Sequence, residues 1–134
     1  MQTLYKKDAR QFISVFVKKL DIADYNEVRS KFEKYLKSNR LECIITTTEK
    51  VVYAYGKKVE QYLNCELSNY LQDLAHDEHF GGMRSANLEI TNNIRINRVF
   101  YCEPLKSFKT IGCIVIFYRQ DDQESAYNLL KKIR

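Results

Sequence analysis

The sequence lacks tryptophan, and it has only one proline and four glycines among its 134 residues. So little proline and glycine leaves almost no material for flexible linkers, and neither a low-complexity tract nor an internal repeat is present, which predicts one domain. No apolar run approaches the ~18 residues of a membrane span. The charged residues between Lys6 and Arg10 precede only about six apolar-rich residues, which is too short for a signal peptide. We therefore predict a cytoplasmic protein with no membrane partner.

The cysteines lack the close spacing that metal and redox sites need. Cys43, Cys65, Cys102 and Cys113 are far apart, and no two of them form a C-x-x-C pair. This spacing argues against a zinc cluster and a dithiol redox motif. Three of the four fall in strand-like runs. In a reducing compartment we expect them to act as small core hydrophobes.

The net charge of +5 has two readings. Between Phe80 and Arg119, six basic residues stand against two acidic ones, Glu89 and Glu103. A basic segment of this kind is compatible with nucleic-acid binding, and equally with a solvated sheet edge and its loops. The six residues are Arg84, Arg95, Arg98, Lys106, Lys109 and Arg119.

Hydrophobic periodicity predicts the elements of the first half of the chain. Residues 8–20 fit a helix or a strand equally well. Residues 24–37 predict a helix, in which Asp24 and Glu27 would form a capping box. The β-rich runs 43–48 and 51–55, two residues apart, predict a hairpin that Gly56 ends.

From Val59 to Leu74 the apolar residues keep helical spacing throughout, which predicts one long helix. Further strands are predicted at residues 86–91, 94–102 and 111–119, with Pro104 marking a loop or an edge. A last helix follows Asp122.

The run of residues 111–119 is apolar on both faces, as a central strand covered on both sides would be. Strands adjacent in sequence form antiparallel sheets, and helices must cover them. The predicted fold is therefore α+β, with a five-to-six-stranded antiparallel sheet and helices packed on it.

Two segments resemble a known family. IITTTEKVVYAYGKKVEQYLNCELSNYL (residues 44–71) and IGCIVIF (residues 111–117) resemble the GAF domain of the stage V sporulation protein T type. The matching positions form a strand, a short turn, a second strand ending at Gly56, a K-K-x-x-x-Y-L-N segment and the late central strand. The resemblance covers residues 22–134 and extends, more distantly, to the GAF domains of CodY-type bacterial regulators.

The resemblance implies a GAF-like, non-catalytic sensory domain that forms a homodimer and is linked to transcription regulation. It also implies a break in the long helix near residues 64–68, against the periodicity. The family's full-length members carry an AbrB-type DNA-binding domain ahead of the GAF domain. Only about 20 residues precede the match here, so DNA binding is not carried over. We divide the chain into an N-terminal segment, 1–21, as a candidate dimer element, and a GAF-like domain, 22–134.

Few residues suggest chemistry. His76 and His79 share a helical face at i, i+3, but no third ligand has matching spacing, so we predict no metal site and no cofactor. No nucleophile has a recognisable base beside it, and no glycine-rich phosphate loop is present, so we predict no enzyme activity.

The abundant aromatic residues are compatible with core packing, with dimer contacts or with a pocket lining. In GAF-type folds the cavity lies between the sheet and the loops and helices that join its strands. On that basis we predict a small-molecule site lined by Tyr53, Tyr55, His76, His79, Phe80, Arg98 and Tyr101. The alternative is a nucleic-acid-associated protein that uses the basic residues of segment 84–119.

Overall fold

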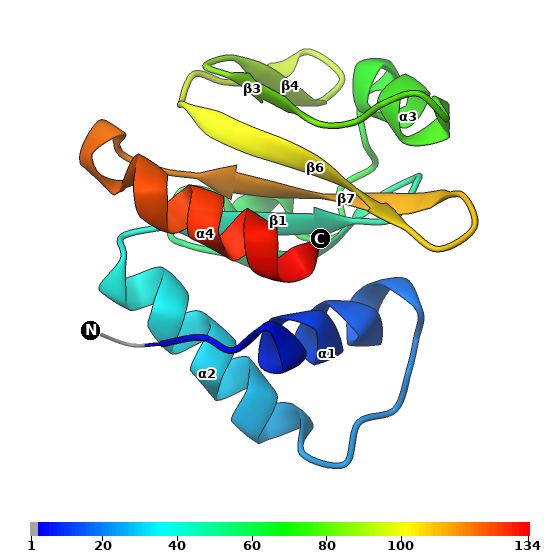
Figure 1. The fold of residues 1–134 in the computed structure, drawn as a ribbon. Helices are drawn as coiled ribbons and strands as arrows, with labels where there is room; N and C mark the ends of the chain where they lie inside the picture. Colours follow the sequence, from blue (N-terminus) through cyan, green and yellow to red (C-terminus); the bar gives the residue numbers. More distant parts are fainter. Residues whose placement is uncertain (1–2) are drawn as a thin grey trace.

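A computed structural model describes residues 3–134 of the chain (Figure 1). The described residues form an α+β fold with four α-helices, a five-stranded antiparallel sheet and a separate two-stranded sheet. The helices are α1 (Lys6–Val17), α2 (Tyr25–Ser38), α3 (Asn69–His76) and α4 (Gln123–Ile133), with short 3-10 turns η1 (Glu60–Tyr62) and η2 (Gln120–Asp122). The strands are β1 (Glu42–Thr46), β2 (Val51–Tyr55), β3 (Met83–Ser85), β4 (Leu88–Thr91), β5 (Ile94–Ile96), β6 (Phe100–Lys106) and β7 (Thr110–Phe117).

Strand β7 is the centre of the main sheet, whose order is β2-β1-β7-β6-β3. It pairs with β1 on one side, where Ile44 lies opposite Val115, and with β6 on the other, where Cys102 lies opposite Val115. Every residue from Gly112 to Phe117 is buried. The prediction of a central strand covered on both faces is confirmed.

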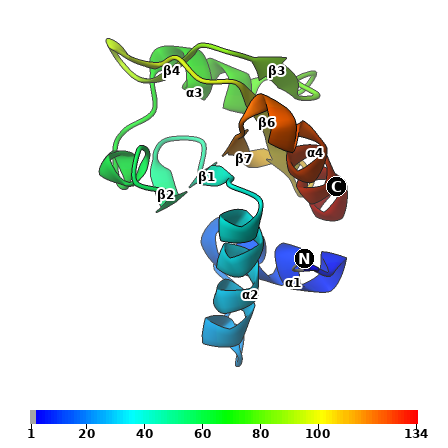
Figure 2. The ribbon, with the colours of Figure 1, turned by 90° about the vertical axis from the view of Figure 1, so that its left-hand side faces the viewer.

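The sheet lies between two layers, which the edge-on view in Figure 2 separates. Helices α1, α2 and α4 cover one face, and α3 with the β4–β5 hairpin covers the other. Alternation along β7 supplies both cores, because Ile114 and Ile116 enter the first and Val115 and Phe117 enter the second.

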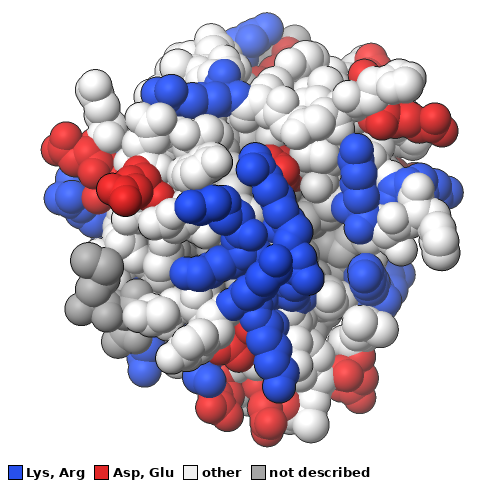
Figure 3. Space-filling model, viewed as in Figure 1, with Lys and Arg blue, Asp and Glu red and all other residues white. Residues whose placement is uncertain are grey.

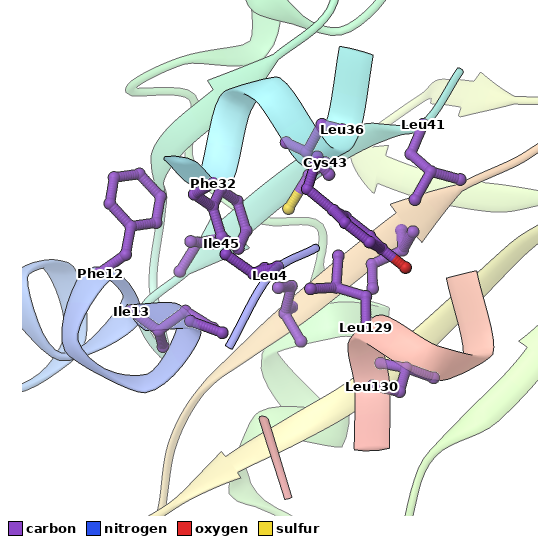
Figure 4. Packing of buried hydrophobic residues seen from close by; sticks show 14 of the residues in the cluster. Leu4, Phe12, Ile13, Phe32, Leu36, Leu41, Cys43, Ile45, Leu129 and Leu130 are labelled. Carbon is purple, nitrogen blue, oxygen red and sulfur yellow. The ribbon is translucent and has the colours of Figure 1, made fainter. Parts of the chain in front are cut away.

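The core on the side of α1, α2 and α4 combines aliphatic side chains with a cluster of aromatic rings, of which Figure 4 labels Phe12 and Phe32. The rings of Phe12 and Phe32 stack at 4.5 Å between centroids, and Tyr53 meets Phe12 edge-on at 5.0 Å. Both phenylalanines are fully buried. Aromatic pairs of this geometry stabilise a fold by about 0.5–1.5 kcal/mol beyond their buried area. They join α1 to α2 and both helices to β2.

The ambiguous residues 8–20 are therefore helical up to Val17, because the helix buries Ala9, Phe12 and Ile13 on one face. This helix belongs to the same core as the rest of the chain. Of the N-terminal segment 1–21, Met1 and Gln2 lie outside the described residues.

The predicted long helix over residues 59–74 is wrong, and the break that the resemblance implied is present. Helical geometry ends after the 3-10 turn η1, at Leu63 with a ψ of 130°, Asn64 follows with a φ of +70°, and the backbone then pairs with the end of the first hairpin. Val51 donates to the carbonyl of Cys65, and Leu67 donates to that of Glu49. The helix restarts at α3, where the Ser68 hydroxyl accepts from the N–H of Leu71.

Three other predictions need correction. Asp24 stands at the N-terminus of α2, but neither its side chain nor the predicted capping box with Glu27 caps the helix. Residues 94–102 are two strands, β5 and β6, rather than one. A turn at Asn93 brings β5 back against β4 in the small sheet, whereas β6 pairs with β7 in the main sheet. Strand β3 was not predicted, since three residues show no periodicity.

Pro104 lies within β6 and not in a loop. Only residues Phe100 to Cys102 of β6 pair with β3, so Pro104 faces an unpaired edge there. A proline is tolerated at such an edge because no neighbouring strand needs its missing N–H. The predicted edge position is confirmed.

Within residues 3–134 no helix is both long enough and apolar enough to cross a membrane. Cys43, Cys102 and Cys113 are buried, and Cys65 is partly exposed. Three of the four cysteines thus behave as the core hydrophobes that the sequence predicts.

Gly112 gives a direct test of the packing between β1 and β7. A Cβ at this position would lie 2.9 Å from the carbonyl carbon of Thr46 and nearer still to its oxygen. We expect Gly112→Ala to lower the free energy of unfolding by about 1–3 kcal/mol, because backbone atoms must move to admit the methyl group. Gly81→Ala is the matched control, since nothing lies within 4 Å of its Cβ position. Equal urea midpoints for the two variants would contradict this packing.

The cysteines give a second test. Burial raises the pKa of the Cys43 thiol, and a hydrogen bond to Cys113 followed by burial raises that of Cys102. We expect an aromatic disulfide reagent at about pH 8 to label Cys65 in the folded protein, because a thiol must be exposed and ionised to react. The other three should react only in denaturant, and Cys65→Ser should abolish the fast reaction. Rapid labelling of more than one thiol under native conditions would show that the core is not closed.

Candidate functional site

A hollow with a volume of about 500 Å³ lies where α1, α4 and the outer half of the β6–β7 hairpin meet. Its apolar lining comes from all three elements: Ile13, Val17, Pro104, Leu105, Ile111 and Ile133. Its polar lining is Arg10, Ser14, Lys18, Glu103, Lys106 and Arg134, with Gly81 at the edge. A volume of this size is typical of small-molecule sites. We call this cavity the basic hollow.

Helix α1 supplies one wall through regular spacing. Arg10, Ser14 and Lys18 follow each other at intervals of four residues, so their side chains lie along one face of the helix. The Ser14 hydroxyl donates to the carbonyl of Arg10 at 2.8 Å. Ile13 and Val17, one residue earlier in each interval, turn their apolar side chains toward the sheet core.

The opposite wall is held by an ion pair between β6 and the end of α4. The guanidinium of Arg134 donates to both carboxylate oxygens of Glu103, at 2.8 and 3.3 Å. This contact raises the pKa of Arg134, chiefly through the hydrogen bond. Arg10 donates in turn to the main-chain oxygen of Arg134. These bonds join α1, α4 and β6 around one cavity.

Positive charge dominates this part of the surface. Four cationic side chains and one carboxylate line the basic hollow, and the carboxylate of Glu103 is already neutralised by Arg134. Figure 3 shows Lys and Arg side chains gathered in the middle of this face, where Figure 1 draws the C-terminal end of α4 beside α1. Among the described residues, Lys18 and Lys106 have no carboxylate within 4 Å.

The seven residues predicted to line a site are not brought together. Tyr53 is buried against α1, and its hydroxyl donates to Glu33 at 2.7 Å. Burial is the main cause that raises its pKa. Tyr55 borders a separate, open hollow on α2. Tyr101 stacks on Tyr118 at 5.0 Å beside α4.

The other four lie elsewhere. Phe80 belongs to the core on the side of α3, across the sheet from Tyr53. Arg98 pairs with Glu42 and stacks over the ring of Phe117. His76 and His79 are exposed; the His76 ring donates to the carbonyl of Gln72 in its own helix, and His79 lies in the turn that begins at Asp77. The three tyrosines stand on strands and pack on the side of α1, α2 and α4, whereas Phe80 follows α3 and packs on the other side, a separation that the sequence does not reveal.

The space between the sheet and the layer of α3 and the β4–β5 hairpin is filled. Its core contains fully buried side chains such as Ile44, Leu88, Phe100 and Phe117. The basic hollow lies instead at the border of the face that α1 and α4 cover. No part of the sequence-level prediction included Arg10, Lys18 or Arg134. The spacing of Arg10, Ser14 and Lys18 was the one signal that pointed toward it.

The six basic residues of segment 84–119 do not form one face either. Arg98 precedes β6 and Lys106 ends it, so the length of the strand from Phe100 to Lys106, about 20 Å for six steps of ~3.3 Å, lies between them. Arg95 lies on the separate small sheet, beside Asn87. Arg84 donates to the Tyr118 hydroxyl at 2.7 Å.

The basic hollow is lined by basic and apolar side chains. Its single carboxylate is held by two hydrogen bonds, and its lining holds neither a thiol nor a histidine. Across residues 3–134 no group of three potential metal ligands comes together. The chemistry that the lining does offer is positive charge above an apolar floor.

No protein-family model matches the sequence, and no curated protein matches it either.

Proposed function

We propose that this chain is a non-catalytic, GAF-like sensory domain that binds a small molecule in the basic hollow. The observation that carries the proposal is the cavity itself, which three elements distant in the sequence build together. The five-stranded antiparallel sheet between two layers supports the GAF-like assignment, as do the segments that resemble the sporulation regulator. The ligand site that we now favour differs from the seven residues predicted from the sequence.

A ligand in the basic hollow would act on the packing of the helices. It would contact α1, α4 and the β6–β7 hairpin at once. Helix α4 is also bonded to α2, because Tyr35 donates to the carbonyl of Ser125 at 2.8 Å and Arg40 pairs with Asp122. A ligand that favours one arrangement of these helices by a few kcal/mol would shift their equilibrium substantially. Such a shift is the signal that a regulatory domain transmits.

The binding function is tested by filling the cavity. We expect at least one compound in a panel of amino acids, nucleotides and organic acids to raise the melting temperature of the protein by about 10 °C near 100 times its Kd. Ser14→Phe places a ring in the basic hollow and should abolish that shift. Ser30→Phe, on an exposed part of α2, is the matched control and should retain it. A shift that survives in Ser14→Phe would locate the ligand elsewhere, and no shift with any compound would count against a sensory function.

We also propose, from the family resemblance, that the domain acts as a homodimer. Sedimentation equilibrium should then report twice the 15.9 kDa of one chain at micromolar concentration. A mass of one chain over the whole concentration range would contradict it. The same measurement on the protein with its ligand bound tests whether the ligand changes the association.

A further inference from the structure

We infer that the ligand of the basic hollow is an amphipathic anion, with one carboxylate or phosphate group on a hydrocarbon body. This inference rests on the binding function proposed above and adds the chemical class of the ligand. Two features of the cavity carry it. One is the unbalanced positive charge at its rim, and the other is the apolar floor beneath.

The cations of the lining are close enough to act together on one anion inside the cavity. A sphere of about 500 Å³ is about 10 Å across, and charge is screened over ~8 Å at physiological ionic strength. Lys18 comes from the end of α1 and Lys106 from the end of β6, so only the fold brings them to the same cavity. An anion placed between them would be attracted by both.

The acid already in the cavity does not supply this anion. Both oxygens of Glu103 accept hydrogen bonds from Arg134, and Glu103 is buried on β6. Arg10 uses one N–H on the main chain of Arg134, and a guanidinium has five N–H donors, so further donors remain. Lys18, Lys106 and Arg10 therefore form the set available to an anionic head group.

The apolar floor of the basic hollow determines the chemistry of the part of the ligand that carries no charge. Val17, Leu105, Ile111 and Ile133 are partly or wholly buried side chains without polar atoms. A free phosphate or a small polar acid would leave them in contact with water. A hydrocarbon chain or ring would cover them, and burial of apolar surface is the main source of affinity in such pockets.

A matched set of eight-carbon probes tests the inference by isothermal titration calorimetry, below their micellar concentrations. The set is octanoate, octyl phosphate, 1-octanol and octylammonium, with inorganic phosphate as the anion without a body. We expect one or both of the anionic amphiphiles to bind at least about tenfold more tightly than the other three probes, because only they satisfy both the rim and the floor. The tighter of the two identifies the head group as carboxylate or phosphate.

The site is assigned with a double variant, Lys18→Gln/Lys106→Gln. Both side chains are exposed, so the fold should be retained, as circular dichroism will check. We expect the affinity for the better anion to fall by about tenfold or more, and its dependence on salt to weaken. Lys57→Gln/Lys58→Gln, an exposed pair after β2, removes the same charge away from the hollow and should bind as the wild type does.

Three results would overturn the inference. These are equal binding of octanol or octylammonium, unchanged affinity in the Lys18/Lys106 variant, and no binding of either anionic amphiphile below about 1 mM. A neutral or cationic compound that stabilises the protein and is blocked by Ser14→Phe would leave the binding function in place and remove only the anionic class.

Discussion

Burial of one strand on both faces is the constraint on which the rest of this structure depends. Strand β7 has no solvent-facing side between Gly112 and Phe117, so the chain must provide two separate layers to cover it. Helices α1, α2 and α4 form one layer, and α3 with the β4–β5 hairpin forms the other. The close approach of Thr46 to Gly112 shows how tightly β1 is seated against this strand.

The basic hollow lies at the end of the β6–β7 hairpin, where the layer of helices that covers the sheet ends. Strand β3 pairs with the first three residues of β6 only, and β6 and β7 continue beyond it to the turn at residues 107–109. At this end the apolar side chains of Leu105 and Ile111 are covered by α1 and α4 incompletely, which leaves a cavity with an apolar floor. The α3 side offers no equivalent space because large side chains fill it.

The ion pair between Glu103 and Arg134 neutralises the carboxylate of the cavity, so that the charge left in the lining is positive. It uses the one side-chain carboxylate of the lining and leaves Lys18 and Lys106 without a carboxylate partner among the described residues. The lining thus offers positive charge and apolar surface. The hydrogen bond from Arg10 to the main-chain oxygen of Arg134 ties the end of α4 to α1.

The sequence alone determined the scaffold. The apolar run on both faces of residues 111–119, the hairpin around Glu49, and the helical stripes beginning at Tyr25 and Gln123 are local patterns, and local patterns survive without knowledge of the fold. Where long-range pairing competes with periodicity, local reasoning failed, as at Asn64, whose segment pairs with the first hairpin instead of extending a helix.

The candidate site could not be predicted from local sequence patterns. Arg134 is 124 residues from Arg10 and 31 residues from Glu103, and no periodicity relates the three. Only the packing of α1 and α4 against the end of the β6–β7 hairpin brings their charges to one cavity.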